Sequence, residues 1–155
     1  MHIRLLAVGD RQPSWVDSAF SDYVARLPRQ WQFRLETITY KRQKSTPAET
    51  AKNAEGEKIL GKIKTADHVV VLDERGKQFS SKELAEKIDD WQSAGADIVF
   101  VIGGPDGVSA DLLARANTRW SLSKLTLPHG LARVLYAEQI YRAWSLSTGH
   151  PYHRE

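Results

Sequence analysis

Strand signals and helix signals alternate along the 155 residues of the chain. Two short apolar runs, 69–72 and 98–102, are typical of strands that are covered on both faces of a parallel sheet. The expected strands are 2–9, 33–40, 68–73, 97–102 and a segment within 120–127. The expected helices are 14–27, 46–64, 80–94, a short one after residue 109, and 131–147. This alternation predicts an α/β fold in which helices flank a mostly parallel sheet.

Four hydroxyl residues are expected to cap the N-termini of these helices. Ser14, Thr46 and Ser80 each stand three residues before an acidic residue, which is the spacing of a capping box. In that motif the hydroxyl accepts a hydrogen bond from a free helix amide, and the acidic side chain reaches back to the cap. Ser109 is expected to cap the short helix that follows it.

The composition favours a single domain that spans residues 1–155, because the chain has no internal repeat and no Pro, Gly or Ser-rich linker. The absence of cysteine excludes a disulfide framework, a thiolate nucleophile and a cysteine zinc site, and no metal is expected. The longest apolar runs are far shorter than the ~20 residues that a membrane-spanning helix needs. The N-terminal stretch lacks the pattern of a secretory signal. We therefore expect a cytoplasmic protein without a membrane partner.

The charge is unevenly distributed along the chain. The 22 Lys and Arg exceed the 19 Asp and Glu by three. Residues 23–65 carry ten basic and four acidic residues, residues 82–111 carry two and seven, and residues 112–155 carry six and two. Basic segments on either side of an acidic one suggest a face that binds a polyanion. Taken alone, the charge fits a solvated, lysine-rich helix surface better.

Two expected strands end in glycine-containing turns, at 72–76 and at 102–107. In open α/β sheets, ligands bind outside the carboxyl ends of the strands, and glycine lets backbone amides approach a ligand closely. Neither turn has the spacing of a dinucleotide-binding or Walker motif. A third stretch, 121–129, places small hydroxyl residues between leucines and can offer an apolar wall. It ends at His129, at the mouth of the last helix, where the helix dipole favours the neutral imidazole.

The last helix carries apolar residues on more than one face, which indicates burial by the sheet and by a second subunit. Glu138 and Arg142 are spaced to form an ion pair within this helix. Arg133 and Arg142 are also candidates to reach a phosphate. The tail 149–155 combines a proline, a tyrosine, two histidines and an arginine, and this favours contact with RNA, where Tyr and His stack on bases and Arg binds phosphate.

Five motifs resemble the ribosomal RNA large subunit methyltransferase H family, a SPOUT-class family of S-adenosylmethionine enzymes. The motifs are LDxxGK at 72–77, IGGPxG at 102–107, SLSxLTxPH at 121–129, YRAWS at 141–145 and HPYHRE at 150–155. The resemblance covers the whole chain. It implies a C-terminal trefoil knot, a homodimer, and methylation of N3 of a pseudouridine in 23S ribosomal RNA within the assembled ribosome.

The resemblance also implies where S-adenosyl-L-methionine binds. The matching positions are Leu72, Gly103, Leu122, Ser123, Lys124, Leu125, Thr126 and Leu127. Methyl transfer from a sulfonium needs no metal, but the N3 proton must be removed. The candidates to accept that proton or to polarise the uracil ring are His129, His153 and Arg154, and Tyr152 is expected to stack on or orient the base. Arg154 would stabilise the developing imide anion, since arginine stays protonated.

The alternative is a non-catalytic RNA-binding or ribosome-associated factor that uses the same basic face. That alternative accounts for the charge pattern. It does not account for two glycine-rich turns at strand ends or for the specific tail.

Overall fold

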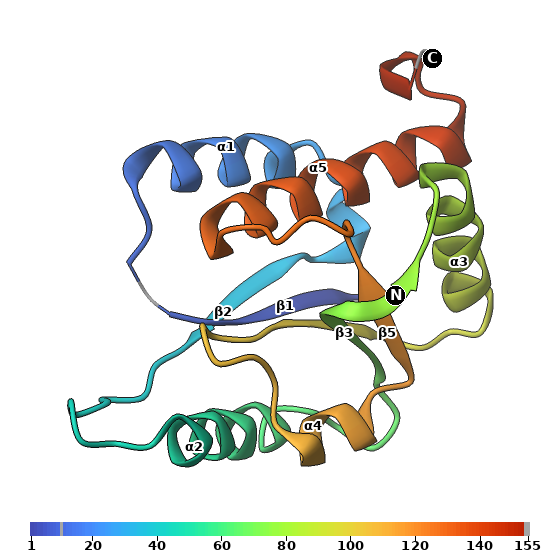
Figure 1. Ribbon diagram of the computed structural model, residues 1–155. Coiled ribbons are helices and arrows are strands. Elements are labelled where there is room, and N and C mark those ends of the chain that lie inside the picture. The colour runs from blue at the N-terminus through green and yellow to red at the C-terminus, as the bar shows by residue number, and fades with distance from the viewer. Residues whose placement is uncertain (10, 154–155) are drawn as a thin grey trace.

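A five-stranded sheet forms the centre of the computed structural model, which describes residues 1–9 and 11–153 (Figure 1). The strands are β1 (Ile3–Val8), β2 (Arg34–Ile38), β3 (His68–Gln78), β4 (Ile98–Ile102) and β5 (Thr118–Ser121). Their order in the sheet is β2-β1-β4-β3-β5, and every neighbouring pair is parallel. The predicted α/β fold with a mostly parallel sheet is therefore confirmed.

Helices cover both faces of this sheet. They are α1 (Ser14–Ala25), α2 (Ala48–Leu60), α3 (Ser81–Ser93), α4 (Ala110–Arg115) and α5 (His129–Thr148), with short 3-10 turns η1 (Arg29–Trp31) and η2 (Pro151–His153). Figure 1 shows α1, α3 and α5 on one side of the sheet and α2 and α4 on the other. No helix in the described part of the chain combines the length and the apolar composition that crossing a bilayer requires.

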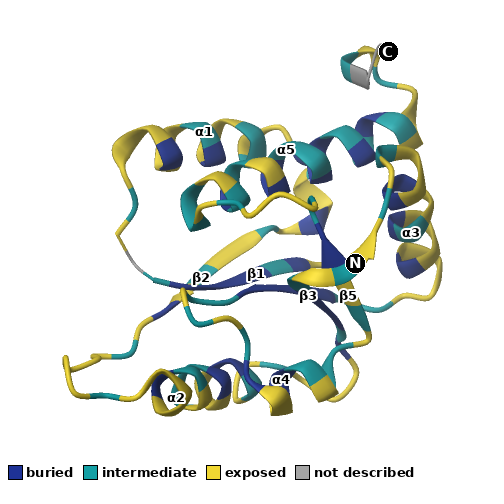
Figure 2. Ribbon diagram, viewed as in Figure 1, coloured by how far each residue is buried: buried dark blue, intermediate teal, exposed yellow. Residues whose placement is uncertain are grey.

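The alternation of side chains along β1 builds a separate core on each face of the sheet. Leu5 lies in the cluster that contains Phe20 of α1 and Ile140 of α5. Leu6 lies in the second cluster, together with Ile59 of α2. Figure 2 shows that the central strands β1 and β4 are buried along most of their length, as expected for parallel strands covered by helices on both faces.

Several element boundaries differ from the sequence-based expectation, and three of them lie near the carboxyl edge of the sheet or in the last helix. The strand expected at 68–73 continues to Gln78, and its register with β5 shifts between Leu72 and Lys77, so the segment between them is displaced from regular pairing. The strand expected within 120–127 ends at Ser121, and the following residues form a loop. The last helix begins at His129, directly after Pro128, because proline has the backbone angles of an N-cap residue here.

Two of the four expected helix caps are present. The amide of Glu83 donates to Ser80 Oγ at 3.1 Å and the Ser80 amide donates to Glu83 Oε2 at 2.7 Å, which completes a capping box. Ser109 accepts a hydrogen bond from the amide of Leu112 at 3.2 Å. The caps expected at residues 14 and 46 were wrong, because a proline occupies the N-cap position of α1 and of α2 and no side chain caps either helix.

Replacing Ser80 with alanine is expected to destabilise the protein by about 1 kcal/mol, because the substitution removes the hydroxyl of the capping box. Urea denaturation of the two proteins measures this difference. Ser14→Ala is the matched control, since Ser14 is the first residue of α1 and makes no capping hydrogen bond. Equal losses of stability in both variants would contradict the assignment of the cap.

Candidate functional site

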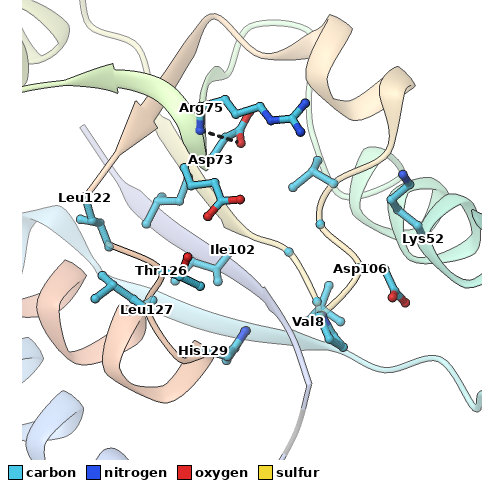
Figure 3. A pocket seen from close by; sticks show the side chains of 18 of the residues that line it. Val8, Lys52, Asp73, Arg75, Ile102, Asp106, Leu122, Thr126, Leu127 and His129 are labelled. Carbon is cyan, nitrogen blue, oxygen red and sulfur yellow. Dashed lines mark hydrogen bonds between the residues drawn. The ribbon is translucent and has the colours of Figure 1, made fainter. Parts of the chain in front are cut away.

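A cleft of about 990 Å³ lies at the carboxyl ends of the parallel strands. It is bounded by the ends of β1 and β4, by residues 72–75 of β3, by the turn 103–107, and by the loop 122–127 that leads into α5 (Figure 3). This is the edge at which open α/β sheets bind ligands. Seven of the eight residues expected to hold the cofactor line the cleft, namely Leu72, Gly103, Leu122, Ser123, Leu125, Thr126 and Leu127. The remaining one, Lys124, is exposed and does not line it.

Gly103 is required by the turn that it begins. A Cβ atom at this position would lie 2.8 Å from Val108 Cγ2 and 2.9 Å from the Gly107 carbonyl oxygen. The chain doubles back here, because Gly104 and Gly107 form an antiparallel bridge and Gly107 has a φ of +86°. The turn therefore presents bare backbone to the cleft, and a side chain at residue 103 would displace it.

The loop 122–127 is held by its own hydroxyl groups. Ser121 Oγ donates to the Ser123 carbonyl oxygen at 2.9 Å, and the Leu125 amide donates to Ser123 Oγ at the same distance. In Figure 3, Leu122 and Leu127 lie on the same side of the cleft as Ile102. These side chains form an apolar wall that suits a flat, largely apolar ligand group.

Charged side chains also line the cleft, and sequence reasoning did not single them out, although it named the turns 72–76 and 102–107. Lys52 of α2 and Asp106 of the turn lie opposite the leucines, whereas Asp73 of β3 lies toward Leu122 and Thr126, with Arg75 above it (Figure 3). The Arg75 amide donates to Asp73 Oδ1 at 3.1 Å, and Asp106 forms an ion pair with Arg42. The cleft thus pairs an apolar wall with a charged wall, as a ligand with an aromatic part and a zwitterionic part requires.

His129 lies in the cleft at the first turn of α5 and contacts a buried arginine. Arg133 Nε donates to His129 Nε2 at 3.0 Å, and Arg133 Nη2 donates to the Gly9 carbonyl oxygen at 2.8 Å. Burial lowers the pKa of His129, the Arg133 charge lowers it further, and a backbone hydrogen bond with Gly103 raises it. Burial also lowers the pKa of Arg133, while Asp17 raises it. The expectation that Arg133 reaches a phosphate was wrong, because its side chain is only 2% exposed and bonded inside the fold.

A second cluster forms where the tail folds back onto α5. The Tyr152 hydroxyl donates to Glu138 Oε1 at 2.9 Å, and Arg142 donates to the same oxygen through Nε at 2.9 Å and Nη2 at 2.7 Å. The expected pair of Glu138 and Arg142 is confirmed. Partial burial, and then hydrogen bonds with Tyr23 and Glu138, raise the pKa of Tyr152 well above that of a free phenol. Tyr152 is therefore a neutral hydrogen-bond donor at physiological pH.

Aromatic contacts hold the described part of the tail against the C-terminal half of α5. The rings of Tyr141 and Tyr152 lie 4.5 Å apart, and those of Trp144 and His150 lie 5.5 Å apart. Among the described residues, no group of three or more metal-ligating side chains is placed to hold a metal ion. The site predictions at the His153 side chain and at Arg154 fall outside the described residues.

A family model described as "Predicted SPOUT methyltransferase" matches residues 1–153. The chain belongs to this methyltransferase family. It is 47% identical over 156 residues to "Ribosomal RNA large subunit methyltransferase H" of Hahella chejuensis and 48% identical to the protein of the same name in Chromobacterium violaceum, with full coverage of both sequences in each comparison. The resemblance based on five motifs is therefore confirmed.

The fold of this SPOUT methyltransferase also resembles a solved structure. The structure of a probable methylase family protein from Haemophilus influenzae Rd KW20 matches with a TM-score of 0.58 at 14% identity, and the match covers 99% of this chain and 70% of the other. At that identity the likeness concerns the fold alone. Membership in a family of methyltransferases favours an enzyme over the alternative of a non-catalytic RNA-binding factor.

Within one chain, the methyltransferase keeps the cleft and the tail apart. His129 begins α5, whereas Tyr152 contacts Glu138 and Tyr141, which are nine and twelve residues further along the helix. At 1.5 Å per residue these positions are roughly 14 to 18 Å from His129 along the axis. Figure 1 shows the described part of the tail at the C-terminal end of α5, away from the strand ends that border the cleft. The structure brings the expected cofactor residues together with His129, and it does not bring Tyr152 to them.

Proposed function

We propose that this chain transfers a methyl group from S-adenosyl-L-methionine to N3 of a pseudouridine in 23S ribosomal RNA within the assembled ribosome. One observation supports the site of the methyl donor: a cleft with a glycine-rich turn and a leucine wall occupies the carboxyl edge of the sheet. The full-length relatives that are 47–48% identical are named for methylation of large-subunit ribosomal RNA. Such a substrate would place the enzyme in the cytoplasm.

The residues of the cleft fit S-adenosyl-L-methionine. Leu72 and the loop 122–127 would hold the adenosine against the apolar wall, and the bare backbone at Gly103 would allow a close approach. Lys124 would contribute only through the backbone of that loop, since its side chain is exposed. The charged wall suits the amino and carboxylate groups of the methionine part. When bound, the cofactor supplies an electrophilic methyl group.

The protein must orient N3 of the base toward the cofactor and remove its proton. The bond from sulfur to the methyl carbon breaks, the bond from N3 to that carbon forms, and the N3 proton passes to an acceptor on the enzyme or to water. We propose that His153 and Arg154 meet the base, with Arg154 stabilising the imide anion. Tyr152 would donate a hydrogen bond or stack, because its raised pKa keeps it neutral.

A homodimer would bring the tail of one chain to the cleft of the other. The first half of α5 exposes Leu131 and Leu135, and Trp15 of α1 is 55% exposed, so the single chain leaves large apolar side chains uncovered. A second copy that covers them would give α5 the partner expected for a helix with two apolar faces. We also propose that residues 1–155 form one domain with a C-terminal trefoil knot, as the family resemblance implies.

Mass mapping of 23S ribosomal RNA tests the proposed function. A strain that lacks this gene is expected to lose one methyl group from a single pseudouridine, and the wild-type gene on a plasmid is expected to restore it. An identical RNA mass with and without the gene would overturn the proposal. Purified protein with assembled ribosomes and with free 23S RNA then separates the two possible forms of the substrate.

A further inference from the structure

A buried arginine occupies the space between the last helix and the cleft, and the proposed reaction does not use it. Arg133 is 2% exposed, and two side-chain hydrogen bonds connect it to segments that line the cleft. One goes to His129, one turn earlier in α5, and the other to the Gly9 carbonyl oxygen at the end of β1. Burying a guanidinium costs several kcal/mol unless hydrogen bonds and charge compensate for it. An arginine that is buried in spite of this desolvation cost indicates a specific positional role.

The bond from Arg133 fixes the protonation state of His129. An arginine side chain stays protonated, so its Nε always donates. His129 Nε2 lies 3.0 Å from that donor and must therefore carry a lone pair. A neutral imidazole with a lone pair on Nε2 carries its proton on Nδ1. A protonated ring would instead place two positively charged N–H groups against each other.

The other ring nitrogen, Nδ1, carries the proton in this tautomer. The backbone of Gly103 raises the pKa of His129, as a carbonyl oxygen near a ring N–H does. Neither nitrogen then has a free lone pair directed into the cleft, and the ring has no open site for a proton from the substrate.

The geometry points to a positioning role for Arg133: it holds His129 in the Nδ1–H tautomer and ties the first turn of α5 to the end of β1 at the border of the cleft. Two segments distant in sequence are joined in this way, namely the end of β1 and the first turn of α5. The pair would set the position of the imidazole in the cleft and would not accept the N3 proton. This inference rests on the proposed function only for the identity of the cofactor.

The surroundings of the pair keep it rigid. A Cβ atom at Gly130 would lie 2.9 Å from Val16 Cγ2 and 3.0 Å from Gln12 Oε1, so the helix start packs tightly against the segment that leads into α1. Among the charged groups, Asp17 of α1 faces Arg133 and offsets its charge, and Arg133 itself is the charged group that acts on His129. Tight packing and a fixed cation leave the imidazole one favourable orientation.

The tautomer can be observed directly in the wild-type protein. Two-bond ¹H–¹⁵N correlation spectra of protein labelled at histidine nitrogen distinguish a protonated ring nitrogen from one with a lone pair. We expect His129, assigned by its absence from the His129→Asn variant, to show Nδ1 protonated and Nε2 unprotonated at pH 7. An Nε2–H tautomer or a protonated ring at pH 7 would overturn the inference. This measurement needs neither the cofactor nor RNA.

An amide variant, His129→Asn, tests what the tautomer does. Asparagine can place an N–H group near the position of Nδ1. At saturating cofactor, the single-turnover rate of the asparagine variant should fall by less than about tenfold, since general-base catalysis alone would cost roughly 10²–10⁴.

A loss of rate of more than about a hundredfold in His129→Asn, with cofactor affinity unchanged, would identify His129 as the proton acceptor and overturn the inference. Far-UV circular dichroism and the melting temperature show whether the variant is folded. A wild-type protein that fails to bind S-adenosyl-L-methionine would contradict the proposed function, and the spectra would still decide the tautomer of His129.

Discussion

Removal of residues 152–155 is expected to lower the rate of methyl transfer by roughly 10²–10⁴, the contribution of a proton-transfer group, or more if base binding is lost as well. The affinity for S-adenosyl-L-methionine should change little, because the cleft lies at the other end of α5. Single-turnover methylation of ribosomes and isothermal titration of the cofactor measure the two quantities on the same truncated protein.

The truncation also removes contacts that stabilise the fold, and this loss of stability must be separated from the loss of catalysis. Tyr152 packs on Tyr141 and donates a hydrogen bond to Glu138, so the truncation is also expected to lower the melting temperature. The double variant His153→Ala, Arg154→Ala keeps Tyr152 and is the matched control for stability. If this variant melts like wild type and has lost the rate, the tail acts on the substrate. Wild-type turnover by the truncated protein would contradict a catalytic role.

Mixed dimers test whether the tail acts on the partner's cleft. One chain carries the truncated tail and an intact cleft, and the other carries Gly103→Val and an intact tail. If the tail acts across the dimer, co-expression of the two inactive chains is expected to restore methylation, because one cleft then meets an intact tail. Continued inactivity of purified mixed dimers would place the tail in its own cleft. A stable monomer in sedimentation velocity would rule out a tail that acts across a dimer.

The local features of the fold could be predicted from the sequence, because they depend on neighbouring residues. The buried strands followed from continuous apolar runs, and the capping box at Ser80 followed from a spacing of three residues. The boxes expected at residues 14 and 46 failed for an equally local reason. Pro13 and Pro47 already have the extended backbone angles of an N-cap residue. The second of these helices therefore begins one residue later than a cap at Thr46 would require. The first begins at Ser14 itself, so Ser14 lies inside the helix and does not cap it.

Features that depend on distant segments were beyond the sequence. Arg133 looked like a surface cation that could reach a phosphate, because its spacing in α5 does not show that α1 and the end of β1 enclose it. The charged wall of the cleft was missed for the same reason. The turns that carry Arg75 and Asp106 were expected at this edge, but their side chains were not singled out, and Lys52 comes from α2, which only the folded sheet brings there.

The separation of the cleft from the tail could be predicted from the sequence in part. A helix expected at 131–147 already implied a length of about 25 Å at 1.5 Å per residue. That length separates His129 from the tail whenever the tail does not fold back along the whole helix. Its described part folds back only as far as Glu138, and this geometry is the reason that we propose a second chain.

Gly103→Ala is expected to weaken the binding of S-adenosyl-L-methionine by at least tenfold, or about 1.4 kcal/mol. The added Cβ would lie 2.8 Å from Val108 Cγ2 and 2.9 Å from the Gly107 carbonyl oxygen, which is closer than real Cβ contacts. The turn must therefore move, and it borders the cleft. Gly103→Val, with a branched side chain, should have a larger effect in the same direction.

Gly61→Ala is the control for the cost of a new methyl group, because the Cβ there would meet ordinary van der Waals contacts at 3.5 and 3.6 Å at the end of α2. Leu127→Ala supplies an independent test of the cleft, since it removes part of the apolar wall and leaves the turn intact. It should weaken binding by about 1–2 kcal/mol, in proportion to the lost contact area. Folded Gly103→Ala and Leu127→Ala proteins that both bind the cofactor like wild type would show that the methyl donor binds elsewhere.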